Sequence, residues 1–324
     1  MRLCEILRSA SVPVAALVRD PERGEARHLA SLGVELILGD LGNEPALASL
    51  MSGARVAHHC AAHVGDWGPP EQFVSVNVAG TRRVVEAAAK SGVRRFVHLS
   101  STAVYGRPDR GHVTEAWPVR RSGQSYDDTK VDAERVAFAR GAALGLEVAA
   151  IRPPVIYGPY DRNFMPRAVD ALRQGKFLLI DGGKAPLNLV WVDHVVDVMI
   201  AASSEPAAVG EVFNVMDEVG GRPPTVREVA TAIAEAVGAP LPTRSLPFAL
   251  AFAAGTLVHQ AFVVAKANKP PPVTPFSVVI LTRDVVYDAS KAAQMLGFSP
   301  RQHSLEGVRR EADAYARRER GARA

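Results

Sequence analysis

The sequence predicts an α/β protein with a doubly wound parallel sheet and a smaller C-terminal domain. In the first half, short apolar runs alternate with segments of helical periodicity, which is typical of βαβ units. After Gly158, proline becomes more frequent and the segments are less regular. We therefore expect a first domain over residues 1–160 and a second over 161–324, interleaved with the last strands of the sheet. A chain of 324 residues is long enough to bury the core of such an architecture.

The predicted elements of the first half follow one another in strand–helix order. Each helix is assigned from apolar residues at helical spacing, and Gly33 and Gly92 end two of them. In the second half, strand-like runs over 187–192 and 211–215 alternate with helices such as 225–238. The first half comprises strands over 12–20, 34–40, 54–62, 94–101 and 146–158, and helices over 25–33, 44–53, 76–92 and 126–145.

Charge and cysteine usage exclude several classes of protein. The net charge is +4, and the arginines of the C-terminal tail alternate with Glu311, Asp313 and Glu319. That pattern is typical of a solvated helical face, so we expect no nucleic-acid partner. Cys4 and Cys60 form no CxxC pair and no Cys/His cluster, which predicts neither a disulfide framework nor a metal site. A reducing, cytoplasmic setting fits this usage best.

One apolar segment requires separate attention. Residues 247–265, PFALAFAAGTLVHQAFVVA, carry no charge over their whole length. This is near the minimum length for a membrane span, but Gly255, His259 and Gln260 lie inside it. We expect a helix that covers the substrate or lies in a membrane interface, with weak membrane association through this segment. A membrane span and an ordinary core helix remain alternatives.

Tyr126 and Lys130 form the first pair of residues that indicates chemistry. They are four residues apart, on one face of the predicted helix. A phenol with a pKa near 10 is a poor base at neutral pH. A nearby ammonium group favours the phenolate, lowers that pKa and makes the tyrosine a usable proton donor and acceptor. The spacing alone recurs by chance in many helices, so its context decides.

The strand over 94–101 supplies this context, because it ends in Ser100 and Ser101. The carboxyl ends of parallel strands line the ligand crevice of a doubly wound sheet. A hydroxyl group there can donate a hydrogen bond to the substrate oxygen that Tyr126 protonates. The strand over 146–158 ends at the same edge, and its prolines restrict the backbone.

Together these motifs resemble the extended short-chain dehydrogenases/reductases, of the NAD-dependent epimerase/dehydratase superfamily. The resemblance implies a Rossmann-type fold and covers essentially the whole chain from residue 3. Each motif is weak alone, but their ordered combination is specific. The matching segments are GDL (39–41), AHHCAAHVGDWG (57–68), NVAGT (77–81), LSSTAVYG (99–106), YDDTK (126–130), RPPVIYG (152–158), VDHVVD (192–197) and KAAQMLGFSP (291–300).

The resemblance assigns a role to several residues. Ser101 is the hydroxyl that orients the substrate, Tyr126 is the acid/base, and Lys130 also holds the nicotinamide ribose. The remaining cofactor contacts implied are Asp40 and Leu41 beside the adenine, Ala61 and Ala62 under the cofactor, and Pro153 and Val155 near the nicotinamide.

Three features favour one branch of this family. The sugar-nucleotide dehydratases carry Asp and Glu after the active-site Ser/Thr, where this chain has Thr102 and Ala103. The segments 61–81 and 282–300 resemble the 3β-hydroxysteroid dehydrogenases, which act on secondary alcohols of bulky apolar substrates. The apolar segment 247–265 suits such a substrate better than a charged diphosphate. Because Arg162 and Arg167 remain available, a nucleotide-sugar epimerase is the alternative.

The end of the second strand indicates the cofactor. NAD-preferring relatives place an acidic residue there to bind the ribose 2′-hydroxyl. Here Val18 occupies that position and is followed by Arg19, with Arg23 one turn further on. A guanidinium group suits a 2′-phosphate, so we expect NADP(H) to be favoured over NAD(H). Asp20 is one residue late, and NAD(H) remains the alternative.

Other residues near the strand ends have simpler interpretations. His58, His59 and His63 cluster without a carboxylate or cysteine at metal-ligand spacing, which predicts packing or a backbone hydrogen bond for each. Trp67 contacts either the substrate or the loop around it. We expect a small apolar substrate and a homodimer.

The N-terminal segment lacks the expected glycine-rich turn, because the first glycine is Gly24. Leu3, Ile6, Leu7 and Ala10 keep the spacing of the buried face of a helix, so the chain is expected to start inside the first helix of the fold, from a truncated or mis-assigned start. Alternatively, residues 2–7 form a short first strand. The missing turn also leaves open a non-catalytic Rossmann-like protein.

Overall fold

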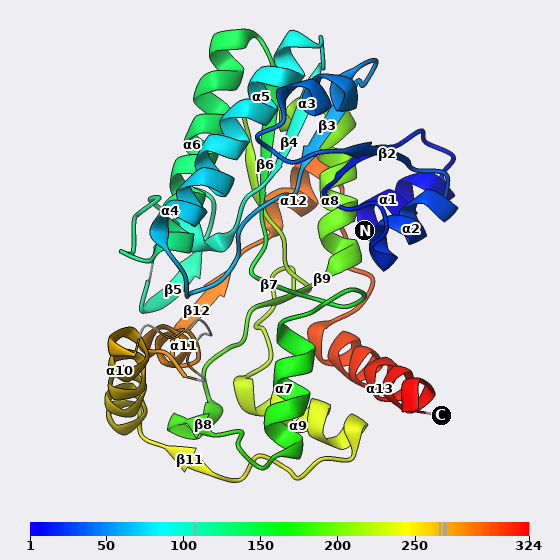
Figure 1. Ribbon diagram of the computed structural model, residues 1–324. Coiled ribbons are helices and arrows are strands. Elements are labelled where there is room, and N and C mark those ends of the chain that lie inside the picture. Colours follow the sequence, from blue (N-terminus) through cyan, green and yellow to red (C-terminus); the bar gives the residue numbers. More distant parts are fainter. Residues whose placement is uncertain (107, 266, 268–270, 272, 324) are drawn as a thin grey trace.

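The computed structural model describes residues 1–106, 108–265, 267, 271 and 273–323 (Figure 1). Its strands are β1 (Ala15–Val18), β2 (Glu35–Leu38), β3 (Val56–His59), β4 (Arg95–Leu99), β5 (Arg110–Val113), β6 (Glu147–Arg152), β7 (Val155–Tyr157), β8 (Leu179–Ile180), β9 (Leu189–Trp191), β10 (Val212–Asn214), β11 (Ser245–Leu246) and β12 (Asp284–Tyr287). Its α-helices are α1 (Arg2–Ser9), α2 (Gly24–Ser31), α3 (Glu44–Met51), α4 (Pro70–Phe73), α5 (Gly80–Lys90), α6 (Ser125–Leu144), α7 (Phe164–Arg173), α8 (Val192–Ser204), α9 (Val226–Val237), α10 (Phe248–Val264), α11 (Pro275–Ile280), α12 (Ser290–Leu296) and α13 (Ser304–Arg323).

A parallel sheet covered by helices on both faces confirms the predicted α/β class. Its strand order is β10-β6-β4-β3, and all neighbouring pairs are parallel. Helices α5 and α6 cover one face and α8 the other (Figure 1). Alternate residues of β4 therefore enter different cores: Phe96 packs towards α5 and α6, and Val97 packs towards α8.

Two predicted elements differ from the structure in their extent. The strand predicted over 146–158 is two strands, β6 and β7, which the Pro153–Pro154 pair separates. Proline has no backbone N–H to donate to a sheet, which explains the break. The helix predicted from residue 76 begins earlier, at Pro70, and passes through a π-helix over Val74–Ala79 before α5.

The sheet is interrupted beside β3. Strands β1 and β2 pair only with each other among the described residues, and β1 does not pair with β3. In the doubly wound order 3-2-1-4-5-6 a central strand lies at this place. No residue of β1 or β2 is buried, whereas four of the five residues of β4 are.

Residues 2–9 form the helix α1, so the alternative of a short first strand is wrong. The prediction that its apolar face is buried is also wrong, because α1 has no buried residue. Leu3 is partly buried and packs against the core beneath α8. Among the described residues no strand joins β1 to β3 beside this helix, which leaves the face half covered.

The second half of the chain forms a separate core beyond the carboxyl end of the sheet. Helices α7, α9 and α13 pack around Tyr157, Leu189 and Ile233. Two strands of this half return to the first half: β10 pairs with β6, and β12 pairs with β5. We retain a division near residue 160 as a proposal. No helix among the described residues combines the length and the apolar character needed to cross a bilayer.

Close packing against the sheet positions helix α6. A Cβ atom on Gly141 would collide with the side chain of Val148 on β6, so only glycine permits this approach. The helix ends at Gly145, which has a left-handed backbone conformation with φ 71°. This contact fixes how far the N-terminal turn of α6, which carries Tyr126 and Lys130, extends beyond the end of β4.

Candidate active site

The structure brings Ser101, Tyr126 and Lys130 together at the carboxyl end of β4. Ser101 begins the 3₁₀ turn Thr102–Tyr105, where its Oγ accepts a hydrogen bond from the backbone N–H of Ala103 at 3.1 Å. Its side chain also forms a hydrogen bond with the Tyr126 hydroxyl. Tyr126 and Lys130 lie one turn apart near the start of α6.

The pKa of Tyr126 differs from the prediction. Burial of the hydroxyl has the largest effect and raises the pKa of Tyr126 to about 12, although the hydrogen bond with Ser101 lowers it. The neighbouring carboxylate of Asp127 raises it further. The expectation that a nearby ammonium sets this pKa below its usual value is therefore wrong for the structure. Tyr126 is a protonated phenol at neutral pH, ready to donate a proton.

Lys130 is buried and only partly satisfied by protein groups. Lys130 is 2% exposed, and its Nζ donates a hydrogen bond to the Leu99 carbonyl oxygen at 2.6 Å. Burial lowers the pKa of Lys130 to about 8, and the Glu134 carboxylate one turn later opposes this effect. An ammonium group has three donors, so this one bond leaves capacity for ligand hydroxyls.

Two further features mark this edge of the site. The Thr102 backbone N–H donates to the Pro153 carbonyl oxygen at 3.0 Å, which brings Pro153 beside the 3₁₀ turn. The hydroxyl of Ser100 is buried and has no hydrogen-bond partner. A buried donor without a partner is expected where a ligand completes the bonding. Val155 lies near Pro153, on β7.

Asn77 was not singled out from the sequence, although it holds the neighbouring loop in place. It lies in the π-helix Val74–Ala79 and is buried. Its side chain accepts from the His63 backbone N–H at 2.7 Å and donates to the His63 carbonyl at 3.1 Å and to Thr129 Oγ1 at 3.0 Å. Asn77 therefore ties the loop after β3 to α6. The signal in the sequence was its position as the first residue of the matching segment NVAGT (77–81), to which no role was assigned.

A buried ion pair fixes α6 against β6. Arg152 Nε donates to Glu134 Oε2 at 2.9 Å, and both residues are buried. Arg152 also donates to the Tyr105 hydroxyl at 3.0 Å, which in turn donates to Asn214 Oδ1 at 2.6 Å. The network joins the 3₁₀ turn after β4 to β6, to β10 and to α6, the helix that carries Lys130. Periodicity cannot reveal such a network.

The residues expected to contact the adenosine half of a cofactor lie at the ends of β1 and β2. These parallel strands pair Val18 with Leu38, so Arg19 and Asp40 extend from the same edge. Leu41 packs on the start of α5, where a Cβ on Gly80 would lie 2.7 Å from its Cδ1 atom. Arg19, Asp20 and Asp40 are exposed, and Ala61 and Ala62 follow β3.

The residues present fit part of a nicotinamide dinucleotide. Lys130, Tyr126 and the unpaired Ser100 hydroxyl suit the nicotinamide-ribose end. The amino terminus and Lys130 both interact electrostatically with Cys60, so the positive end of α1 lies in the same region as Lys130. Such a helix end favours an anion. The first glycine of the sequence is Gly24, at the start of α2.

The remaining polar residues near the strand ends pack within the protein. His63 packs edge-on against Phe73, with their ring centroids 4.4 Å apart. The His59 Nε2 atom forms a hydrogen bond with Thr81 Oγ1 at 2.9 Å. Trp67 Nε1 donates to the Ala267 carbonyl at 3.2 Å, so this tryptophan contacts a neighbouring loop. Within the described residues no group of three or more His, Cys, Asp or Glu side chains could hold a metal ion.

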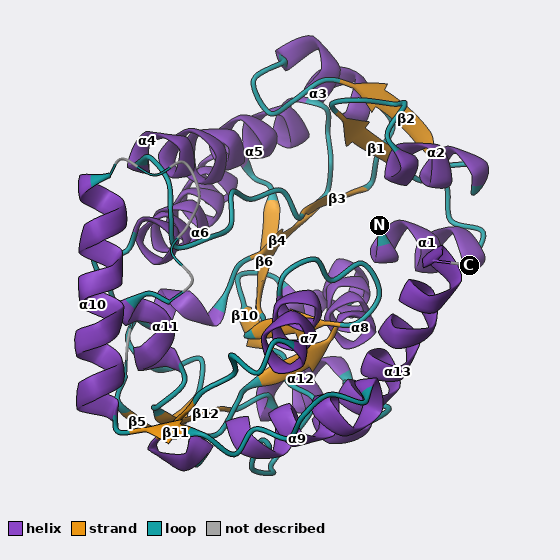
Figure 2. Ribbon diagram, turned by 60° about the horizontal axis from the view of Figure 1, so that its bottom comes forward, coloured by secondary structure: helices purple, strands orange, loops and turns teal. Residues whose placement is uncertain are grey.

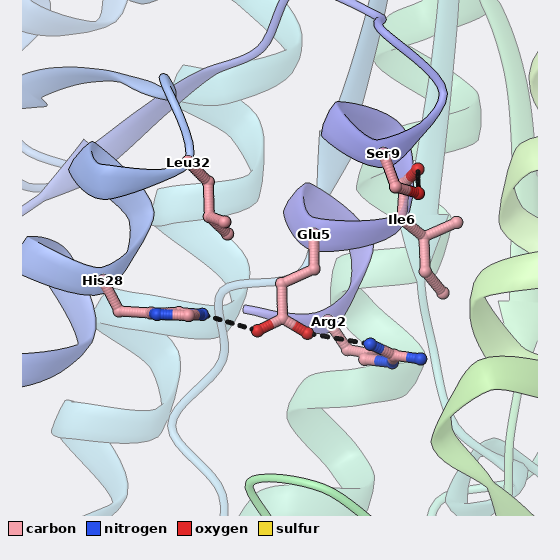
Figure 3. Close-up of a pocket in the computed structure, with 6 residues that line it drawn as sticks. All are labelled: Arg2, Glu5, Ile6, Ser9, His28 and Leu32. Atoms are coloured by element: carbon pink, nitrogen blue, oxygen red, sulfur yellow. Dashed lines mark hydrogen bonds and ion pairs between the residues drawn. The ribbon is translucent and has the colours of Figure 1, made fainter.

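A pocket of about 340 Å³ lies away from these residues, between α1 and α2 (Figure 3). Figure 3 shows the Glu5 carboxylate between His28, 2.8 Å from it, and Arg2, 3.0 Å from it. Arg2 also donates to both carboxylate oxygens of Asp193 on α8, at 2.6 and 2.8 Å. These ion pairs attach α1 to α2 and α8. The pocket contains none of the predicted site residues. We therefore interpret it as part of the packing between α1 and α2 and not as a ligand site.

Comparison with known proteins gives consistent matches. A family model described as the NAD dependent epimerase/dehydratase family matches residues 1–215. The chain is 30% identical over 296 residues, 87% of its length and 67% of the relative's, to 3beta-hydroxysteroid-dehydrogenase/decarboxylase isoform 1 of Arabidopsis thaliana. It is 33% identical over 214 residues, 65% of this chain and 63% of the relative, to the 4-hydroxy-2-methyl-3-oxo-4-farnesyl-3,4-dihydroquinoline-1-oxide ketoreductase of Stigmatella aurantiaca.

A solved structure, MoeE5 in complex with UDP-glucose and NAD, superposes with a TM-score of 0.75 and 25% identity, over 98% of this chain and 95% of that one. In five of these comparisons with curated relatives, the matched region spans 53% to 67% of the relative's length. The same regions cover 53% to 93% of this chain.

Proposed function

Because the chain belongs to the NAD-dependent epimerase/dehydratase family, we propose that it is an oxidoreductase that interconverts a secondary alcohol and a ketone on a bulky apolar substrate. The observation that carries this proposal is the group formed by Ser101, Tyr126 and Lys130. A hydroxyl pair, Ser101–Tyr126, lies one helical turn from a buried ammonium group at the carboxyl edge of the sheet. Proton transfer at a carbonyl oxygen requires this chemistry.

Each of these residues has a distinct role in the proposed reaction. A bound nicotinamide supplies or accepts the hydride. Tyr126 donates its phenolic proton to the ketone oxygen in the reductive direction, and burial keeps this proton in place at neutral pH. Ser101 holds the same oxygen through its hydroxyl group. Lys130 holds the nicotinamide ribose through the donor capacity that its bond to the Leu99 carbonyl oxygen leaves.

We propose NADP(H) as the preferred cofactor, with NAD(H) as the alternative. Arg19 is exposed directly after β1, where a 2′-phosphate is expected. The Asp20 carboxylate accepts a hydrogen bond from the Glu22 backbone N–H at 2.9 Å. This local bond holds the Asp20 carboxylate within its own turn. It therefore favours recognition of a 2′-phosphate by the neighbouring Arg19 guanidinium group.

The proposed substrate class rests on the relatives and on α10. The two curated relatives described above are named for a hydroxysteroid and for a farnesylated quinoline oxide. In this chain the uncharged helix α10 is joined to the loop after β3, where Trp67 packs edge-on against His259 at 5.5 Å. The resemblance to a structure bound to UDP-glucose supports a nucleotide-sugar epimerase as the second candidate.

Initial rates of NADPH and NADH oxidation with a panel of hydrophobic ketones and ketosteroids test the proposal. We expect turnover that Tyr126→Phe abolishes, because this change removes the proton donor and little volume. Tyr315→Phe on α13 is the matched control and is expected to retain full activity. Activity of Tyr126→Phe near that of the wild type would contradict the assigned role.

Assays on the same purified protein distinguish the proposed oxidoreductase from an epimerase and from a non-catalytic protein. An epimerase interconverts UDP-sugars without net oxidation of NADPH. A non-catalytic Rossmann-like protein shows neither reaction. A rise in melting temperature on addition of NADPH, without turnover of any ketone or sugar nucleotide, would favour the non-catalytic alternative.

A further inference from the structure

Two buried side chains near Lys130 have no hydrogen-bond partner among the described residues. They are His98, through both of its ring nitrogens, and Ser100, through its hydroxyl group. His98 is 1% exposed and Ser100 is 3% exposed. A buried polar group without a partner is destabilising, and in native proteins an ordered water often supplies the missing bond. The two side chains therefore indicate a small polar site inside the protein.

His98 lies on the face of the sheet that α6 covers. Successive residues of a strand point to opposite faces, and Phe96, two residues before His98, packs with residues of α5 and α6. Figure 2 shows these layers, with β3 and β4 between the pair α5 and α6 and the helix α8. His98 stacks on His59 of β3, with their ring centroids 5.6 Å apart, and His59 bonds to Thr81 of α5. His98 therefore faces the side from which Lys130 enters the site.

Lys130 reaches the backbone between the two unpaired side chains. Its Nζ donates to the carbonyl oxygen of Leu99 at 2.6 Å, and its charge acts on His98. Ser100 continues the pairing with β6 through its backbone N–H, which donates to the Ile151 carbonyl oxygen at 2.7 Å, so its side chain is on the same face as His98. An ammonium group has three donors. One binds Leu99 and one is assigned above to the nicotinamide ribose, which leaves the third for the protein interior.

We propose that His98, Ser100 and Lys130 form a binding site for one buried water molecule, through which His98 acts as a positioning residue for Lys130. The ammonium group donates to the water. The water donates to the unprotonated ring nitrogen of His98 and to Ser100 Oγ. A buried water makes about three hydrogen bonds, which these three side chains supply. The proton of the Ser100 hydroxyl stays available to a bound cofactor.

The imidazole ring of His98 has to be neutral to accept this bond. Burial, together with the charge of Lys130, lowers the pKa of His98 well below its usual value and lowers the pKa of His59 to about 3. Both rings are therefore neutral at neutral pH. Burial lowers the pKa of Lys130 itself, whereas Glu134 on α6 and Cys60 after β3 raise it.

The water stabilises the charged form of Lys130. A hydrogen bond to an ammonium group favours its protonated state, so the site opposes the effect of burial on the pKa of Lys130. The consequence for catalysis rests on the proposed function: Lys130 keeps its three donors, and thus its bond to the ribose, beside the protonated phenol of Tyr126. The water site itself does not depend on that function.

NMR titration of isotope-labelled lysine side chains, without cofactor or substrate, tests the proposal. The Lys130 signal is the one that Lys130→Met lacks. We expect His98→Leu to lower the pKa of Lys130 by about one unit, because a hydrogen bond to the charged form is lost. His98→Asn retains an acceptor and is expected to restore most of the wild-type value. His58→Leu is the matched control, since His58 is directed towards Ser203 of α8 on the opposite face, and it is expected to change nothing.

These outcomes are independent of the proposed function, because no turnover is measured. Circular dichroism establishes that each variant is folded. Should His98→Leu not fold, Ser100→Ala takes its place, because it removes another partner of the water and little volume, and it is expected to lower the same pKa. An unchanged pKa of Lys130 overturns the proposal, as does an equal shift in His58→Leu. If His98→Asn titrates like His98→Leu, or if a high-resolution crystal structure shows no water between Lys130 and His98, the proposal is also overturned.

Discussion

The hydroxyl group of Ser101 forms bonds on two sides, one with the Ala103 backbone N–H and one with Tyr126. It therefore holds the phenol in place and opposes the effect of burial on its pKa. We expect Ser101→Ala to lower kcat by about 10²-fold, because a hydrogen bond aimed at the developing oxyanion is lost. Steady-state kinetics measure this effect. An unchanged kcat would assign the role to Ser100 or Thr102 instead.

Lys130 predicts a pH dependence of stability. Its pKa is about 8 in the folded protein against 10.5 for an unperturbed lysine, so the unfolded chain binds more protons between these pH values. Raising the pH through this window therefore stabilises the folded wild type relative to Lys130→Met, by on the order of 3 kcal/mol in total. Urea denaturation of both proteins at several pH values measures the difference.

An exposed lysine supplies the control for this measurement. Lys90→Met on α5 is expected to show no such dependence, because Lys90 stays in water in both states. A difference between wild type and Lys130→Met that is constant from pH 7 to pH 10.5 would show that Lys130 is not desolvated.

For single residues, the sequence predicted which side chains lie together in the site but not how their pKa values are shifted. The spacing of Tyr126 and Lys130 places them on one helical face, and a strand end places Ser101 at the sheet edge, as observed. The pKa of Tyr126 could not be predicted, because it depends on how much protein surrounds its hydroxyl. Asn77 acts from a π-helix, a distortion that hydrophobic periodicity does not reveal.

Among the elements, α6 depends on the buried pair of Glu134 and Arg152. We expect Glu134→Gln to reduce the free energy of unfolding by about 3–5 kcal/mol, since it leaves the Arg152 charge buried without its partner. Asp132→Asn on the same helix is the control. Asp132 pairs with Arg121 at the surface, where such pairs contribute about 1 kcal/mol or less. Chemical denaturation compares the two variants, and equal losses would contradict the importance of burial.

Element types were predicted better than element boundaries. All four helices and five strand regions predicted in the first half occur in the structure. The errors lie where local chemistry overrides periodicity. The Pro153–Pro154 pair divides one predicted strand into β6 and β7, and the helix predicted from residue 76 starts at Pro70. The apolar face of α1 was assigned to the correct residues, but the prediction that it is buried was wrong. Its burial depends on how the neighbouring strands pair, which periodicity does not reveal.

At the scale of the whole molecule, the interruption of the sheet predicts uneven stability. Strand β1 has β2 as its one partner among the described residues, and neither strand is buried. We expect backbone amides of β1 and β2 to exchange at least about tenfold faster than those of β4 and β6, because local opening there disrupts few buried contacts. Hydrogen exchange followed by mass spectrometry measures the ratio. Equal protection would show that the two sheets open as one cooperative unit.

The pairing of β5 with β12 has a consequence for biosynthesis. Residues 110–113 of β5 pair with residues 284–287 of β12. During synthesis β5 therefore lacks its partner strand until about 170 further residues have been added. During translation the amino-terminal half is therefore committed to an incomplete intermediate until almost the entire polypeptide has left the ribosome. Over that interval the edge of β5 and the surface later covered by β12 are accessible to chaperones and to misassociation with other nascent chains.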